Sequence, residues 1–128
     1  MNKEWKDKWV TALRSGKYEQ GQGQLATLYT NHNTKYCCLG VLCDIHPDVR
    51  EVRMEAEPAD GTGWIEYYYG KEWDFGRIPI FLREKLNIDA IDEDHLINMN
   101  DGEGIDDENY PKTPSSFELI ADYIEKEM

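Results

Sequence analysis

The most apolar stretch of the chain places the strongest constraint on its fold. Residues 36–45 read YCCLGVLCDI, and Asp44 is the only charged residue among them, although charged residues make up 31% of the chain. We expect a helix over 39–45 whose apolar and thiol side chains pack into the core. Gly40 then lets another backbone approach this helix closely. His46-Pro47 ends the helix, because the residue before a proline avoids the helical conformation.

Helical patterns are also found at both ends of the chain. Apolar residues recur on one face over residues 4–14, which predicts an amphipathic helix. Ser115 and Glu118 have the spacing of a capping box that opens a last helix. Between these ends, Pro79 is typical of the first turn of a helix, and Asp92 is suited to cap a further short helix.

Residues 49–76 have the character of a sheet instead. They are rich in strand formers and contain the hairpin signal Asp60-Gly61. We expect a small antiparallel sheet of about three strands, packed with four to five helices. Because the strands cluster in the middle of the chain, the predicted fold class is α+β rather than α/β. The length fits a single domain over 1–128, with an acidic loop at about 100–114.

Charge is distributed unevenly along the chain. Residues 1–64 hold 8 basic and 9 acidic side chains, whereas residues 65–128 hold 6 basic and 17 acidic ones, so nearly all of the net charge of −12 lies in the second half. This charge argues against a protein that coats nucleic acid and against one that binds an anionic membrane surface. No run approaches 18 apolar residues and no signal peptide is visible, so we expect a cytoplasmic protein with reduced thiols.

The acidic residues are densest over residues 89–108, which hold nine acidic side chains and no Lys or Arg. This segment is interpreted either as a solvated, self-repelling surface or as an acidic face that meets a basic partner by imitating nucleic-acid phosphate. An EF-hand is excluded, because neither Gly102 nor Gly104 at position 6 of the loop gives the required ligands. A looser cation site around Asp101, Glu103 and Asp106 is not supported by any motif.

The cysteines allow two further hypotheses. A thiol of Cys37 or Cys38 at a helix N-terminus would have a lowered pKa and could serve a hydrolase. Its base would be a histidine and its orienting group Asp44 or Asn100; the candidate bases are His32, His46 and His95. The simpler interpretation is that the thiols pack in the core.

Zinc ligands could in principle be drawn from Cys38, Cys43, His46 and His32. The paired spacing of structural zinc sites is absent, and positions 38 and 43 lie about 140° apart around a helix. We therefore predict no metal and no cofactor.

Aromatic residues alternate across the predicted sheet, so one face should be core and the other should leave rings exposed for a flat base or a partner. A phosphate ligand needs arginine, and Arg50, Arg53, Arg77 and Arg83 lie near the relevant elements. Asn100 and Asp101 follow an apolar helical stretch and either cap it or donate and accept hydrogen bonds with a polar ligand. The predicted ligand-binding residues are Trp64, Tyr68, Arg53, Arg77, Asn100 and Asp101.

Three segments match a known pattern: WVTALRSGKY at 9–18 with QGQGQL at 20–25, YCCLGVLCD at 36–44, and MND at 99–101 followed by SFELIADYI at 116–124. In these the chain resembles a family of small acidic uncharacterised proteins of tailed bacteriophages, over most of its length apart from residues 50–78. The acidic insertion at 103–113 is longer than in the usual pattern. The resemblance implies a phage origin and a location in the host cytoplasm during infection, and it implies no catalytic mechanism.

Together these observations favour a phage accessory protein that acts by binding rather than by catalysis, in counter-defence. One hypothesis is that it sequesters a small nucleotide-type signal molecule. The alternatives are an acidic inhibitor that engages a basic host protein and a Cys-dependent hydrolase. A homo-oligomer is compatible with each of them.

Overall fold

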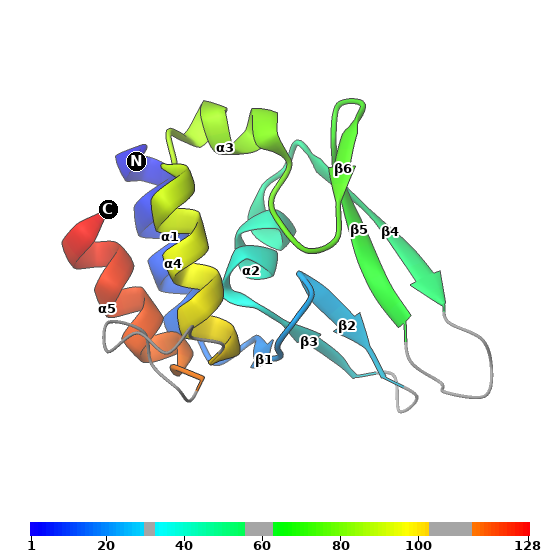
Figure 1. Ribbon diagram of the computed structural model, residues 1–128, viewed down its shortest axis with the longest axis horizontal. Coiled ribbons are helices and arrows are strands. Elements are labelled where there is room, and N and C mark those ends of the chain that lie inside the picture. Colours follow the sequence, from blue (N-terminus) through cyan, green and yellow to red (C-terminus); the bar gives the residue numbers. More distant parts are fainter. Residues whose placement is uncertain (30–32, 56–62, 103–113) are drawn as a thin grey trace.

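Five helices and one mixed sheet make up the part of the chain that the computed structural model describes, namely residues 1–29, 33–55, 63–102 and 114–128 (Figure 1). The helices lie together on one side of the sheet, and both ends of the chain lie at the helical end of the molecule. The predicted α+β class is therefore confirmed. Every helix within these ranges is too short or too polar to cross a lipid bilayer.

The sheet is larger than the sequence predicts. Its strands are β1 (Glu19–Gln20), β2 (Ala26–Leu28), β3 (Thr34–Tyr36), β4 (Val49–Glu55), β5 (Gly63–Tyr69) and β6 (Glu72–Asp74). The order is β1-β3-β2-β5-β4, with β6 on β5 beyond the end of β2. The antiparallel strands β4, β5 and β6 are those expected within 49–76, whereas β1 and β3 add a parallel pair. The hairpin signal Asp60-Gly61 lies outside the described residues.

The helices are α1 (Lys3–Arg14), α2 (Cys38–Ile45), α3 (Ile80–Leu86), α4 (Ala90–Asp101) and α5 (Phe117–Glu127). Helices α1 and α5 pack together, and α2 lies between α1, α4 and the sheet. Arg14 fastens α1 to α5 through ion pairs with Glu118, Asp122 and Glu125. Because these pairs are exposed, each adds only a little stability.

The residues that cap two of the helices lie close in sequence to the predicted ones but differ from them. Asp89, not Asp92, caps α4, since its side chain accepts a hydrogen bond from Ile91 N at 2.7 Å. Asp92 lies in the first turn instead, where it accepts from Tyr123 Oη at 3.0 Å. Ser116 caps α5, while the buried Ser115 donates its backbone N–H to Met99 O. In both cases the neighbouring polar residue is used in a tertiary contact that the local pattern does not contain.

Helix α2 forms the centre of the core, as the apolar run predicts. Residues 38–43 are all buried, and Trp9 donates its indole N–H to Cys38 O at 2.8 Å. Gly40 is the point of closest approach, because a Cβ atom built there would lie 1.8 Å from Leu25 O. The expectation that Gly40 admits a second backbone is confirmed.

The Gly40→Ala variant should therefore be strongly destabilised, by about 3 kcal/mol, because the added methyl group cannot fit without moving β2 away from α2. Gly76→Ala is the matched control, since its Cβ would meet nothing closer than 3.9 Å. Denaturant unfolding of both variants measures the difference. Equal stability of the two would contradict the packing described for α2.

Candidate functional site

The sheet has one face that none of the described helices covers. Side chains alternate along β5, so Ile65 and Tyr67 point into the core and are fully buried. Trp64, Glu66 and Tyr68 point to the opposite side, which we call the outer face. Directly paired residues on neighbouring strands share a face, so the strand register determines which side chains meet there.

One cross-strand row on the outer face consists of Arg50, Tyr68 and Trp73, contributed by β4, β5 and β6. The Tyr68 and Trp73 rings stack with their centroids 6.0 Å apart, and the Arg50 guanidinium carbon lies 4.7 Å from the Tyr68 centroid. Trp73 is 49% exposed. Among the described residues no carboxylate makes an ion pair with Arg50.

A second row crosses the outer face at Met54, Trp64, Thr27 and Lys35. Beside it lies an open groove of about 540 Å³, whose lining includes Gln22, Gln24 and Tyr29 as well as Trp64. The Phe75 ring lies 6.3 Å from that of Trp64. This part of the face combines aromatic rings with amide groups that can donate and accept hydrogen bonds.

Glu66 lies between these two rows, opposite Val52. It is only 8% exposed, and its Oε1 accepts a hydrogen bond from Tyr68 Oη at 3.3 Å. No other hydrogen bond or ion pair joins its carboxylate to the described residues. A carboxylate can accept about four hydrogen bonds, so most of the acceptor capacity of Glu66 is unused.

On the outer face the structure brings together only two of the six predicted site residues. Trp64 and Tyr68 share the outer face, as the alternation of aromatic residues predicts. Arg53 pairs with Ile65 and therefore lies on the other side of β4, which makes Arg50 the arginine of the outer face. The choice between the two arginines depends on the register, which alternation alone does not set.

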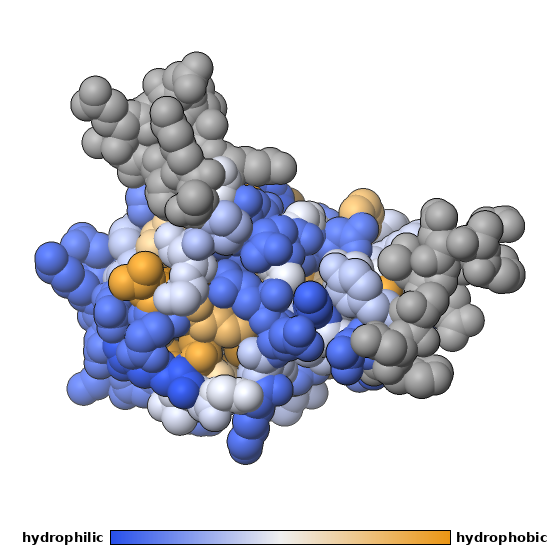
Figure 2. All heavy atoms as spheres, turned by 90° about the horizontal axis from the view of Figure 1, so that it is seen from below, coloured by the Kyte–Doolittle hydropathy of each residue, from blue (hydrophilic) through white to orange (hydrophobic). Residues whose placement is uncertain are grey.

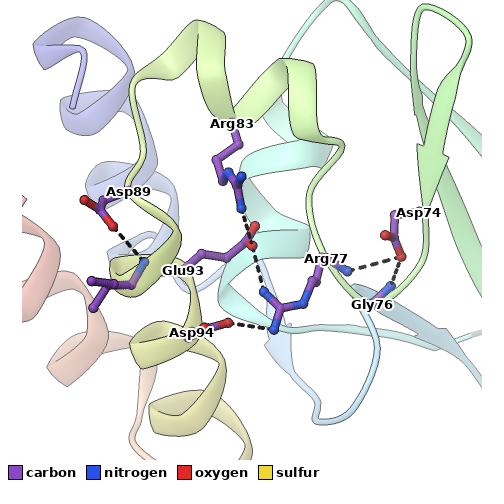
Figure 3. Close-up of polar contacts among 8 residues, drawn as sticks. Asp74, Gly76, Arg77, Arg83, Asp89, Glu93 and Asp94 are labelled. Carbon is purple, nitrogen blue, oxygen red and sulfur yellow. Dashed lines mark hydrogen bonds and ion pairs between the residues drawn. The ribbon is translucent and has the colours of Figure 1, made fainter.

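Arg77 is committed to carboxylates of α4 (Figure 3). Its Nη1 donates to Glu93 Oε1 at 3.0 Å and its Nη2 pairs with Asp94 Oδ1 at 2.6 Å. Arg83 also reaches Glu93 Oε1, at 3.4 Å. Since Glu93 is 1% exposed, these two arginines compensate a buried charge. Arg77 thus joins α4 to the segment that follows β6, and its predicted role in ligand binding stays a prediction.

Asn100 is a structural residue as well. Its Oδ1 accepts from Cys38 N at 3.1 Å and from Gln20 Nε2 at 3.0 Å, and its Nδ2 donates to Gly21 O at 2.8 Å and to Asp101 Oδ1 at 3.0 Å. The side chain is fully buried and all four of its hydrogen-bonding positions are filled. The adjacent cavity measures only about 10 Å³, so it has no room for a ligand.

Asp101 has an indirect connection with the outer face. Its Oδ1 accepts from Gly23 N at 3.0 Å. The same turn, through Gln22, Gly23 and Gln24, lines the groove beside Trp64. Asp101 therefore holds the wall of the groove in place rather than contacting its contents.

We expect Asn100→Ala to lower the free energy of unfolding by about 3 kcal/mol or more, because it leaves buried partners on three segments without their hydrogen bonds. Asn98→Ala, on the same helix and only half-buried, should change stability by less than about 1 kcal/mol, since alanine favours helices. Urea unfolding of both variants makes the comparison. Similar losses would mean that the amide network contributes little.

The three thiols are buried and free of disulfides. Cys37 does cap α2, with its Sγ accepting from Gly40 N at 3.4 Å. However, burial raises the pKa of Cys37 to about 12 and also raises the pKa values of Cys38 and Cys43. The expected lowering of the thiol pKa is wrong, because desolvation outweighs the helix terminus. The hydrolase hypothesis gains no support from this arrangement.

The native thiols should therefore resist modification at about pH 8, because a reagent must wait for the protein to open. Labelling with a disulfide reagent should be rapid in concentrated guanidinium chloride and far slower in the native protein, whereas the added thiol of Ser15→Cys should react at once. Stability should also fall as pH rises above the ordinary thiol value of 9.0 towards about 12, since only the unfolded chain then releases these protons. Native Cys37 reacting as fast as the added thiol would contradict this account.

The described residues contain no cluster of three or more His, Cys, Asp or Glu side chains that could hold a metal ion. Glu103, Asp106 and His32, which belong to the cation and zinc sites considered above, lie outside the described ranges. The acidic residues of 89–101 mostly have partners within the fold, because Asp89 and Asp92 accept hydrogen bonds and Glu93 and Asp94 pair with Arg77.

A second groove, of about 680 Å³, runs beside α1 and includes Trp5, Tyr18 and Ile45 in its lining. Figure 2 shows a mostly hydrophilic surface with an apolar hollow among the helices. Two polar side chains of its lining are paired, Lys8 with Glu4 and Tyr18 with Asp44. We take the outer face of the sheet as the better candidate site, because it combines stacked aromatic rings with an arginine that makes no ion pair among the described residues.

The model of a family described as a domain of unknown function, DUF8296, matches residues 1–128. Neither a curated protein nor a solved structure matches the chain.

Proposed function

We propose that this chain, which belongs to the DUF8296 family, is a binding protein that holds a small nucleotide-type ligand on the outer face of its sheet. The row of Arg50, Tyr68 and Trp73 carries the proposal. It presents a stacked pair of rings and a cation without an ion pair among the described residues, and a nucleotide needs both.

The base would stack on the open face of the Trp73 ring, because the Tyr68 ring lies between Trp73 and Arg50. Aromatic side chains on an open sheet face are a common platform for unpaired bases, and each stacked base contributes about 1–3 kcal/mol of binding free energy. Trp73 has half of its surface available for such a contact. The Tyr68 ring beneath it is held between Trp73 and Arg50, so the platform is ordered before a ligand arrives.

The phosphate would pair with Arg50. A guanidinium binds phosphate through charge-assisted hydrogen bonds, and here it would not first have to break an ion pair. The net charge of −12 favours a small ligand over a nucleic-acid strand, because a strand would place many phosphates near the acidic half of the chain.

The biological setting of the proposal comes from the sequence. The resemblance to small acidic proteins of tailed bacteriophages supports an accessory protein that acts in the host cytoplasm during infection. Sequestering a nucleotide signal would counter a host defence that depends on that signal. The acidic-inhibitor alternative is less well supported, since the described acidic residues of 89–101 are largely engaged within the fold.

A thermal-shift screen with mono-, di- and cyclic nucleotides tests this function. A true ligand at 100 times its Kd should stabilise the protein by about 2.7 kcal/mol. Trp73→Ala should weaken binding about tenfold or more without unfolding the protein, because it removes one exposed ring of the platform. Phe81→Ala, which removes a 59% exposed ring from α3, should leave binding unchanged. Absence of a shift with every nucleotide would reject the proposal.

A further inference from the structure

We infer that the edge of β4 is the surface through which two copies of this chain pair as a two-fold symmetric dimer. β4 is the last strand in the order of the sheet, and within the described part of the chain it is paired on one side only, with β5. Its seven residues therefore present an unpaired backbone edge about 23 Å long on the other side. The opposite end of the sheet is β1, which has two residues and offers a much shorter edge.

The side chains along this edge are available for a partner. Arg50, Glu51 and Arg53 are exposed, and β4 lies at the end of the molecule away from α1 and α5 (Figure 1). Neither Glu51 nor Arg53 makes an ion pair with another described residue. A strand that is paired on one side only is the element of a sheet to which a further strand can add.

The charges of β4 are arranged symmetrically about its middle residue, Val52. In an antiparallel pair of two copies related by a two-fold axis at Val52, Glu51 of each copy lies opposite Arg53 of the other. Directly opposite residues of antiparallel strands are close enough for opposite charges to attract. The dimer therefore gains two ion pairs from side chains that have no ionic partner among the described residues of the single chain.

The same charges disfavour the neighbouring registers. Because opposite residues share a face of the sheet, the two-fold axis must lie between one residue and its own copy. Moving the axis by one residue places either Glu51 opposite Glu51 or Arg53 opposite Arg53, and directly opposed like charges are destabilising. With the axis at Val52, all seven residues of each strand overlap, and on the other face Val52 meets its own copy.

A second copy fits this edge better than an unrelated strand does. Charged side chains on an edge strand normally hinder the addition of other chains. Here a matching strand must carry an acidic and a basic residue two positions apart, and β4 running antiparallel to itself meets that requirement. One strand pair makes a small interface, so we expect the dimer to dissociate reversibly. The pairing does not require a bound nucleotide.

The first experiment needs no variant. Sedimentation equilibrium of the unmodified protein from about 1 μM to about 1 mM should show the mass rising from 15.0 kDa to twice that value. Salt at about 1 M should weaken the dimer, because exposed ion pairs are screened. A mass of 15.0 kDa at every concentration would overturn the inference.

The second experiment reverses the charges. Glu51→Arg and Arg53→Glu each replace two attractive pairs by two repulsive ones, so either variant alone should dimerise about tenfold more weakly or worse. An equal mixture of the two variants should recover the dimer, because the heterodimer again places an arginine opposite a glutamate at both positions. The doubly reversed chain restores both pairs within one sequence and decides the question if a single variant does not fold.

Glu127→Arg is the matched control, since it makes the same change at an exposed residue of α5, far from β4. It should dimerise like the unmodified protein. Undiminished dimerisation of both single variants would overturn the inference. A mixture of two folded variants that stays at the mass of the single chain would overturn it as well.

Discussion

The buried side chain of Asn100 is the interaction on which the arrangement of the helical layer depends. One amide joins the end of α4 to the first turn of α2 and to the backbone that follows β1. These segments lie far apart in the sequence, so no local preference brings them together. The amide also fills the N-terminal hydrogen-bonding position of α2 at Cys38 N, which has no partner within its own helix. The apolar helix can therefore be buried at that end without leaving an unsatisfied donor.

The two faces of the sheet have different physical roles. The inner face packs against α2 and holds the fully buried Ile65 and Tyr67. The outer face carries the aromatic side chains of Trp64, Tyr68 and Trp73. Arg50 and Glu66 lie on the same face, and each contacts Tyr68 rather than the other. The exposed ring of Trp73 contributes less to folding stability than the buried side chains of the inner face.

The sequence predicts the features that depend on local pattern. The helices, the α+β class, the burial of residues 38–43 and the close approach at Gly40 all follow from periodicity and residue size. The short strands β1 and β3 are missed, because two or three residues within a turn-rich stretch show no period. The caps at Asp89 and Ser116 are missed because Asp92 and Ser115 are better local matches that tertiary contacts take over.

Only the part of the candidate site that depends on local pattern can be predicted from the sequence. Alternation along β5 is sufficient to place Trp64 and Tyr68 on one face. Choosing Arg50 rather than Arg53 needs the register of β4 against β5, and recognising Asn100 as structural needs partners that are 62 and 79 residues away. Glu66 is missed altogether, because a carboxylate within an aromatic strand gives no signal until its neighbours on the same face are known.

The row of Arg50, Tyr68 and Trp73 comes from one continuous piece of the chain, β4 to β6, whereas the core is assembled from segments distributed over its whole length. Side chains on the outer face can therefore be exchanged without disturbing the contacts of α2, α4 and α5. Along β5 the two sets of residues alternate, with Ile65 and Tyr67 in the core and Trp64 and Tyr68 on the outer face. The composition of the outer face can therefore change in this strand while every second residue keeps the core intact.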